Sequence, residues 1–143
     1  MEKNQSGLTM LELVVTVAVI AIISAISTPY YIRYRTGAQL REGIFTLKAD
    51  LGRARSIAVR GRSDVLVQLS SGSYTIGTMN PVELPSGVRI NLTATNIDND
   101  NLTFSSKGLP KNSINDTGTI VLENSSGESR NININRLGRI TIQ

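Results

Sequence analysis

The chain of 143 residues carries a formal net charge of +4, is 40% hydrophobic, and contains neither cysteine nor histidine. Those two absences exclude disulfides, thiolate metal sites, the common zinc sites, and nucleophilic triads built on histidine or cysteine. This length allows one anchor helix and one small domain, while mild basicity suits lipid headgroups, nucleic acid or acidic proteins without selecting among them.

The first predicted element is an apolar stretch, residues 13–32, which contains no charged side chain. A helix needs about 20 apolar residues to cross a bilayer, so the sequence predicts a membrane-spanning helix here. Glu12 places an ionised carboxylate at the start of the stretch, which is costly unless another group pairs with it. We therefore expect Glu12 to have a functional role.

Two ordinary explanations of this stretch stay open. A secretory signal peptide has a shorter apolar region behind a basic segment, whereas Lys3 is the only basic residue ahead of this one. Its cleavage would fall after Ala25 or Ser27. The other explanation is a plain single-pass anchor, in which Glu12 merely lies at the membrane edge.

The order of residues at the start of the chain resembles the processing site of type IV pilins and pseudopilins. A short polar leader ends in Gly7, and Leu8, Thr9, two apolar residues and Glu12 lead into the apolar helix. The resemblance implies that a prepilin peptidase cleaves between Gly7 and Leu8 and methylates the new amino terminus on Leu8. Phenylalanine is usual where Leu8 stands, and a proline is frequent in the family where Pro29 stands.

The resemblance also implies a role for Glu12 and, within the same motif, for Thr9. Pilin helices leave the membrane for a filament core, where each carboxylate meets the amino terminus of a neighbouring subunit. Leaving either charge alone in that core would cost about 3 to 5 kcal/mol. The implied partners are the prepilin peptidase, other pilins or pseudopilins, an inner-membrane assembly platform, and membrane lipid before assembly.

The charges that flank the stretch conflict with the orientation of this family. Arg33, Arg35 and Arg41 follow the apolar segment and only Lys3 precedes it, so the positive-inside rule alone places the carboxyl end in the cytoplasm. The resemblance implies the opposite: a bacterial inner-membrane protein with one span and its carboxyl-terminal domain in the periplasm. We follow the motif.

The helix is expected to continue past the membrane as an amphipathic stem. Apolar residues recur there at alternating steps of four and three, namely Leu40, Ile44, Leu47, Leu51, Ala54 and Ala58. Pro29 removes a helix hydrogen bond, which predicts a kink, and Gly37 is a second position at which the helix could bend easily. Gly61 follows the last periodic residue and predicts the end of the stem.

Beyond Asp64, short β-prone runs alternate with turn formers. We predict strands over residues 65–69, 74–77, 88–93, 102–105, 119–123, 130–135 and 139–142. In residues 130–135 isoleucine alternates with asparagine, which predicts one buried face, one wet face, and an antiparallel sheet covered by the stem.

A long amino-terminal helix followed by a β-rich domain predicts an α+β protein with the type IV pilin fold. Residues 45–67 and the closing segments around Gly108 and Gly138 resemble the GspH/FimT group of minor pseudopilins and pilins. The expected divisions are a leader (1–7), a transmembrane or filament-core helix (8–32), a stem (33–62) and a β-rich globular domain (63–143). The implied function is that of a structural subunit of a type II secretion pseudopilus or a type IV pilus.

The alternative function is DNA binding in DNA uptake. Some FimT-like proteins end in Gly-Arg-x-Arg, and here Gly138 and Arg139 are followed by Ile140 and Thr141, so the second arginine is missing. The basic side chains that would contact phosphates are Arg139, Arg53, Arg55 and Arg60. Charge on the wet face of an amphipathic helix more often serves solvation.

The loop over residues 96–101 is rich in asparagine and aspartate, and some major pseudopilins hold calcium in a loop. As a calcium-binding helix-loop-helix motif it lacks the central glycine, and Lys107 stands where the distal glutamate belongs. A polar surface loop is the preferred interpretation. We expect no metal, no cofactor and no enzymatic activity, because no motif assembles the remaining serine, threonine, carboxylate or lysine chemistry.

Overall fold

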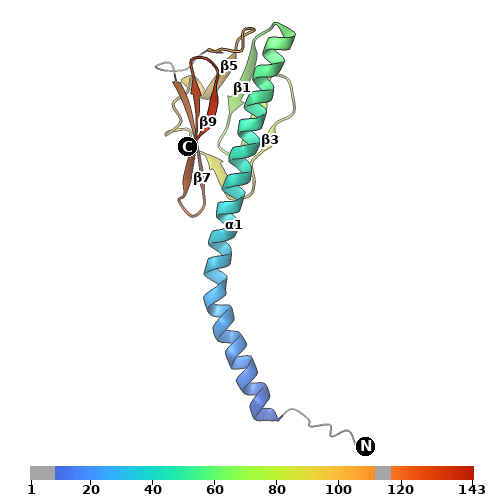
Figure 1. Cartoon of the computed structure of the whole chain (residues 1–143), viewed down its shortest axis with the longest axis vertical. Helices are drawn as coiled ribbons and strands as arrows, with labels where there is room; N and C mark the ends of the chain where they lie inside the picture. Colours follow the sequence, from blue (N-terminus) through green and yellow to red (C-terminus); the bar gives the residue numbers. More distant parts are fainter. Residues whose placement is uncertain (1–8, 112–116) are drawn as a thin grey trace, which may run out of the picture. The chain divides into compact units, whose positions relative to one another are not determined.

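Figure 1 shows the computed structural model of the chain, which describes residues 9–111 and 117–143. One long helix, α1 (Met10–Gly61), precedes all the strands. The later elements are β1 (Val65–Leu69), β2 (Ser73–Ile76), β3 (Val82–Glu83), β4 (Val88–Ile90), the 3₁₀ helix η1 (Asp98–Asp100), β5 (Asn101–Phe104), β6 (Pro110–Lys111), β7 (Thr117–Asn124), β8 (Ser129–Asn135) and β9 (Ile140–Ile142). The chain divides into two compact units, Met1–Arg35 and Thr36–Gln143.

The stem in the second unit buries one stripe of α1. Every apolar residue of the predicted stripe is buried, from Leu40 at 2% exposure to Ala58 at 0%. Gly43 lies in the same stripe, where a Cβ would come within 3.3 Å of Pro85. The stripe therefore supplies one wall of the core, as its spacing predicted.

The carboxyl end of α1 is closed by a Schellman motif. The N–H of Ser63 donates to the carbonyl of Ala58 at 3.3 Å, and that of Arg62 donates to Val59 at 3.4 Å. The left-handed residue of the motif is Arg62, with φ of 48°, one position after Gly61. The helix thus ends at Gly61 as expected, but an arginine takes the backbone conformation that glycine adopts most easily.

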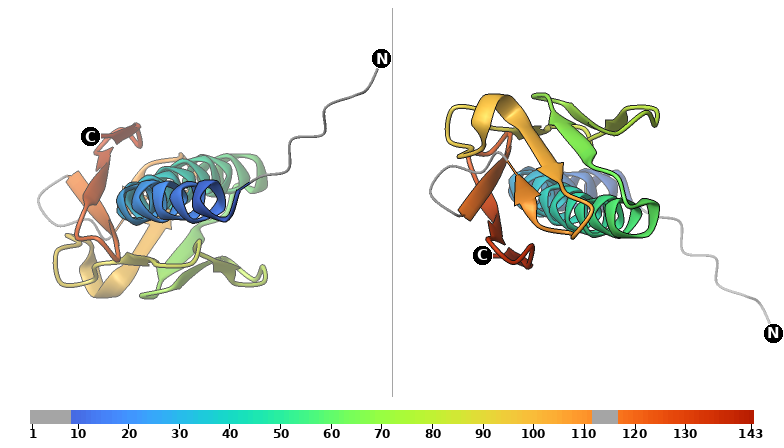
Figure 2. Two further views of the ribbon diagram at one scale, coloured as in Figure 1. Left: turned by 90° about the horizontal axis from the view of Figure 1, so that it is seen from below. Right: turned by 90° about the horizontal axis from the view of Figure 1, so that it is seen from above.

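The strands form two antiparallel sheets, whereas the alternation in residues 130–135 predicted a single antiparallel sheet. Sheet A has the order β3-β2-β1-β5-β6, and sheet B has the order β4-β7-β8-β9. Both pack around the stem, which Figure 2 shows end-on. The sheets are joined where the N–H of Ile90 donates to the carbonyl of Ser71 at 2.7 Å.

The core lies between the buried stripe of α1 and the inner faces of the two sheets. In β1, Val65, Val67 and Leu69 alternate with exposed residues. In β8, Ile132 and Ile134 are fully buried, as expected, and each such side chain contributes about 1.5 to 3 kcal/mol of burial free energy. The alternating asparagines, Asn131, Asn133 and Asn135, are half-buried, whereas the alternation predicted that they face water. Asn133 accepts a hydrogen bond from the hydroxyl of Thr119 at 3.0 Å.

Several strand boundaries differ from the sequence-based prediction. The strand expected over residues 88–93 ends at Ile90, because the side chain of Asn91 accepts the N–H of Ala94 and starts a turn. β3 and β6 were not predicted, since two residues carry no readable alternation. Pro110 in β6 lies on an edge strand, where its missing N–H is tolerated.

Candidate assembly helix and surface arginines

The described chain begins at Thr9, which caps α1. The N–H of Glu12 donates to Oγ1 of Thr9 at 3.3 Å, and the N–H of Leu13 donates to the Thr9 carbonyl at 3.2 Å. Thr9 and Glu12 thus have the spacing of a capping box, with an acid in the first turn, where the helix dipole favours negative charge. Gly7 and Leu8, the expected cleavage and methylation site, lie outside the described residues.

Glu12 is exposed, and it stands next to a long apolar surface. The large apolar side chains from Met10 to Ile32 are between 48% and 85% exposed, and α1 is long and apolar enough to cross a membrane. Neither of the ion pairs found over residues 9–111 and 117–143 involves Glu12. A surface this apolar requires lipid or protein around it. In such surroundings an ionised carboxylate at its edge is costly unless another group pairs with it.

Pro29 lies within α1, which remains helical across it. Two hydroxyl groups just before the proline bond back to the helix: Ser27 donates to the carbonyl of Ile23 and Thr28 to that of Ser24, both at 2.8 Å. Hydroxyl groups that bond to the carbonyl four residues earlier tend to bend helices. These bonds favour a bend close to Pro29, where the kink itself stays a prediction.

The structure separates the four arginines that were singled out for phosphate contact. Arg53, Arg60 and Arg139 are exposed, and the guanidinium of Arg60 donates to the carbonyl of Ser56 within its own helix at 3.4 Å. Arg55 is half-buried and turns toward the domain. Three of the four therefore present charge to solvent, and the fourth is engaged within the protein.

Arg55 connects α1 to one turn of each sheet. Its Nε donates to the carbonyl of Gly108, between β5 and β6, at 2.9 Å, and its Nη2 donates to the carbonyl of Leu137, between β8 and β9, at 3.2 Å. Gly108 and Gly138 both have φ of 73°, and a Cβ on Gly138 would lie 2.4 Å from the Gly108 carbonyl oxygen. Sequence analysis missed this role; the only signal was the position of Arg55 beside the buried Ala54.

A second polar contact fixes the stem against sheet A. The hydroxyl of Tyr74, which is 1% exposed, donates to Oδ2 of Asp50 at 2.6 Å. Burial, and then the neighbouring Asp50 carboxylate, raise the pKa of the Tyr74 phenol above its ordinary value. The phenol therefore stays protonated and keeps donating at neutral pH.

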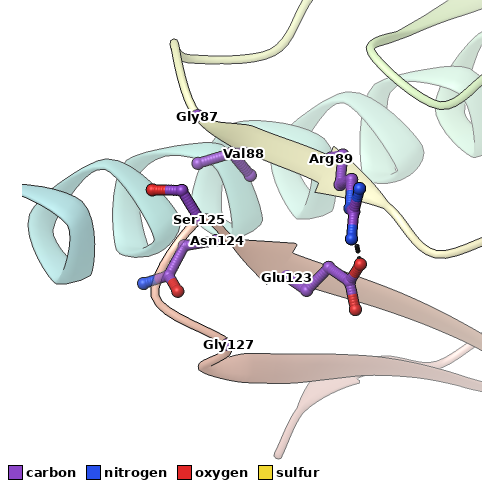
Figure 3. A pocket seen from close by; sticks show the side chains of 7 residues that line it. All are labelled: Gly87, Val88, Arg89, Glu123, Asn124, Ser125 and Gly127. Atoms are coloured by element: carbon purple, nitrogen blue, oxygen red, sulfur yellow. Dashed lines mark hydrogen bonds and ion pairs between the residues drawn. The ribbon is translucent and has the colours of Figure 1, made fainter.

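An open pocket of about 470 Å³ lies beside the β7–β8 turn, lined by residues that include Arg89, Glu123 and Asn124 (Figure 3). Glu123 accepts hydrogen bonds from the side chains of Asn91 and Arg89, which lower its carboxyl pKa. Asn124 is engaged with the turn, since its Oδ1 accepts the N–H groups of Ser126 and Glu128. The polar lining groups named here are thus paired within the protein.

The loop considered for calcium contains η1 and two left-handed residues, Asn99 and Asp100. Over the residues that the structure describes, no group of three or more acidic, histidine or cysteine side chains is placed to hold a metal ion.

Two solved structures share this fold. Both are of the type IV minor pilin FimU from Pseudomonas aeruginosa, in different crystal forms, with TM-scores of 0.55 and 0.56 at 21% and 20% sequence identity. The match covers 73% and 80% of this chain and 92% of FimU in each case. A long amino-terminal helix packed on antiparallel sheets is thus the type IV pilin fold.

Comparison with family models assigns the chain more closely. Residues 46–138 match the family described as type II transport protein GspH, and residues 3–28 match the prokaryotic N-terminal methylation motif. The chain belongs to the GspH family. Pilins and pseudopilins of this class are structural subunits, anchored by one amino-terminal helix, processed by a prepilin peptidase and assembled with other pilins. No curated protein matches the chain.

Proposed function

We propose that the chain is a structural subunit of a type II secretion pseudopilus or a type IV pilus, inserted through α1. The observation that carries this proposal is the exposed carboxylate of Glu12 at the edge of an exposed, membrane-length apolar surface. Residues 1–7 serve as the leader, 8–32 as the core helix, 33–62 as the stem and 63–143 as the globular domain.

The chemistry of assembly follows from cleavage between Gly7 and Leu8. Cleavage creates a cationic amine on Leu8, which the prepilin peptidase methylates, and Thr9 keeps the first turn of the helix capped. In the filament the carboxylate of Glu12 pairs with this amine on an adjacent subunit. Because either charge alone in the apolar core costs about 3 to 5 kcal/mol, the pair also sets the axial register between subunits.

A variant of Glu12 tests this proposal. Glu12→Gln keeps the shape and removes the charge, so we expect filament incorporation to fall by about tenfold or more. Glu42→Gln is the matched control, because Glu42 is an exposed acid of the same helix within the stem. The mass of the amino-terminal peptide checks that both variants are cleaved after Gly7. Full incorporation of the cleaved Glu12→Gln protein would contradict the proposal.

We further propose that the globular domain faces the periplasm, with the inner-membrane assembly platform acting on α1 from the membrane. The absence of native cysteine allows introduced thiols to report topology. In intact spheroplasts of cells that lack the prepilin peptidase, and therefore keep the leader, a membrane-impermeant maleimide should label Ser63→Cys, an exposed position after α1. It should leave Ser6→Cys in the leader unlabelled. The reverse pattern would place the domain in the cytoplasm, as the positive-inside rule predicts.

DNA binding is the second candidate, favoured by the exposed Arg139, Arg53 and Arg60. It has less support, because the guanidinium of Arg55 bonds to two backbone carbonyls and Thr141 stands where the second arginine of the motif belongs. If DNA is a ligand, the full chain in detergent binds duplex DNA at low salt with an affinity that falls steeply as salt rises. Arg139→Gln should then weaken binding more than Arg130→Gln. No binding at low salt would exclude this role.

A further inference from the structure

Three tyrosines and two arginines lie close together on α1 at the end of the apolar stretch. Tyr30, Tyr31 and Tyr34 are 72%, 66% and 71% exposed, and Arg33 and Arg35 lie among them. We call these five residues the tyrosine–arginine collar. At 100° per residue they cover about 200° of the helix circumference, so the collar is a partial ring rather than one stripe.

The collar lies one membrane thickness from Glu12. The uncharged residues 13–32 separate Glu12 from Arg33, and 21 helical steps of 1.5 Å give a rise of about 32 Å. The hydrocarbon core of a bilayer is about 30 Å thick. When Glu12 lies at one surface of the membrane, Arg33 therefore lies at the headgroups of the other, where tyrosine rings also prefer to be.

The charge of the collar selects the headgroup. Between residues 13 and 41 the only charged side chains are Arg33, Arg35 and Arg41, and the first acid is Glu42. Arginine binds phosphate through two parallel N–H groups, and tyrosine hydroxyls can donate beside it. Pro29, Tyr30 and Arg33 also line a shallow hollow of about 200 Å³. A cationic, aromatic site at this depth fits an anionic phospholipid.

We propose that the collar binds the headgroups of anionic phospholipids and thereby sets the depth of α1 in the bilayer before assembly. Arg33 and Arg35 contact the lipid phosphates, while the tyrosine rings occupy the interface between headgroups and acyl chains. This role concerns the membrane-inserted subunit, so it stands or falls separately from the pairing of Glu12 in a filament.

Lipid retention by the purified full chain tests the proposal. Native mass spectrometry in detergent compares phosphatidylglycerol with phosphatidylcholine of the same acyl chains. We expect the unaltered chain to retain phosphatidylglycerol in preference to phosphatidylcholine. Each arginine removed should reduce the retention of phosphatidylglycerol by about fivefold, and Arg33→Gln/Arg35→Gln removes two. Arg53→Gln/Arg60→Gln removes the same charge from the exposed stem and should leave retention unchanged.

Other outcomes of this experiment would overturn the proposal. Equal retention of the two lipids by the unaltered chain, or an equal loss in both double variants, would show that the collar has no preference for anionic lipid. Displacement of phosphatidylglycerol by millimolar inorganic phosphate would indicate a simple anion site. Unchanged lipid retention with lost filament incorporation in Arg33→Gln/Arg35→Gln would assign the collar to subunit contacts instead.

Tyrosine fluorescence gives an independent measure of depth. The chain has four tyrosines and no tryptophan, and the one outside the collar, Tyr74, is 1% exposed within the core. In vesicles, lipids brominated near the headgroup should quench the emission more strongly than lipids brominated near the acyl-chain end. Tyr30→Phe/Tyr31→Phe/Tyr34→Phe leaves only Tyr74 and supplies the unquenched baseline. Stronger quenching from the acyl-chain end would contradict the proposed depth.

Discussion

Arg55 in the middle of the stem donates through Nε to the carbonyl of Gly108, a residue 53 positions later in the chain. With the second bond from Nη2 to Leu137, one side chain fixes the β5–β6 and β8–β9 turns to the helix. Both are charge-assisted hydrogen bonds, of which the one to Gly108 is part-buried and the one to Leu137 is exposed.

Replacing Arg55 should therefore destabilise the globular unit. We expect Arg55→Ala to lower the free energy of unfolding by about 1 to 3 kcal/mol, because both carbonyls lose a charged donor. Thermal unfolding followed by near-ultraviolet circular dichroism measures the change. Arg53→Ala, two residues away on the exposed face, should stay within about 0.5 kcal/mol of the unaltered chain. Equal effects of the two substitutions would remove the structural role assigned to Arg55.

Gly138 should tolerate a side chain less well than Gly127, a second glycine with positive φ. Gly138 and Gly127 have φ of 73° and 82°, so alanine strains the backbone at both. Only at Gly138 would the added Cβ meet the Gly108 carbonyl oxygen at 2.4 Å; at Gly127 nothing lies within 4 Å. Gly138→Ala should cost about 1 to 3 kcal/mol more than Gly127→Ala in urea unfolding. Similar costs would mean that the turns can separate easily.

Because of the Tyr74 phenol, we predict that the protein loses stability at alkaline pH. Its pKa is raised in the folded state, so the unfolded chain loses this proton first as pH rises past about 10. Stability from this group is complete below that pH and falls above it, at up to about 1.4 kcal/mol per pH unit, until the phenol ionises in the folded protein. Tyr74→Phe should flatten the slope above pH 10 and, by removing the donor to Asp50, lower stability at neutral pH. An unchanged slope would show that other groups determine how stability changes with pH above 10.

Arg62 offers a stabilising substitution. Its φ of 48° at the end of α1 is unfavourable for a residue with a Cβ. Arg62→Gly should raise the free energy of unfolding by about 0.5 to 1 kcal/mol, since the gain from relieved strain exceeds the added entropy of the unfolded chain. Ser63→Gly, one position later, should bring no such gain. A destabilised Arg62→Gly protein would indicate that the arginine side chain contributes more than its strained backbone costs.

Short-range patterns in the sequence were sufficient for the helix, the buried stripe and most strands. The spacing from Leu40 to Ala58 predicted the buried face of α1, and the alternation around Ile132 and Ile134 predicted the inner face of β8. These predictions succeed because each depends on the period of a single element, which neighbouring residues already display. The apolar run and Glu12 likewise predict an assembly helix from neighbouring residues alone, and this role stays a prediction.

Tertiary structure alone decided the division into two sheets, the bonds of Arg55 and the contact between Tyr74 and Asp50. Arg55 and Leu137 are 82 positions apart, and no local pattern distinguishes this arginine from the solvated Arg53. Such partners are set when separate elements pack, because polar groups that lose water in the folded chain must then pair with whatever groups the packing brings near them. Local periodicity therefore determines which faces are buried, and packing determines which polar groups meet.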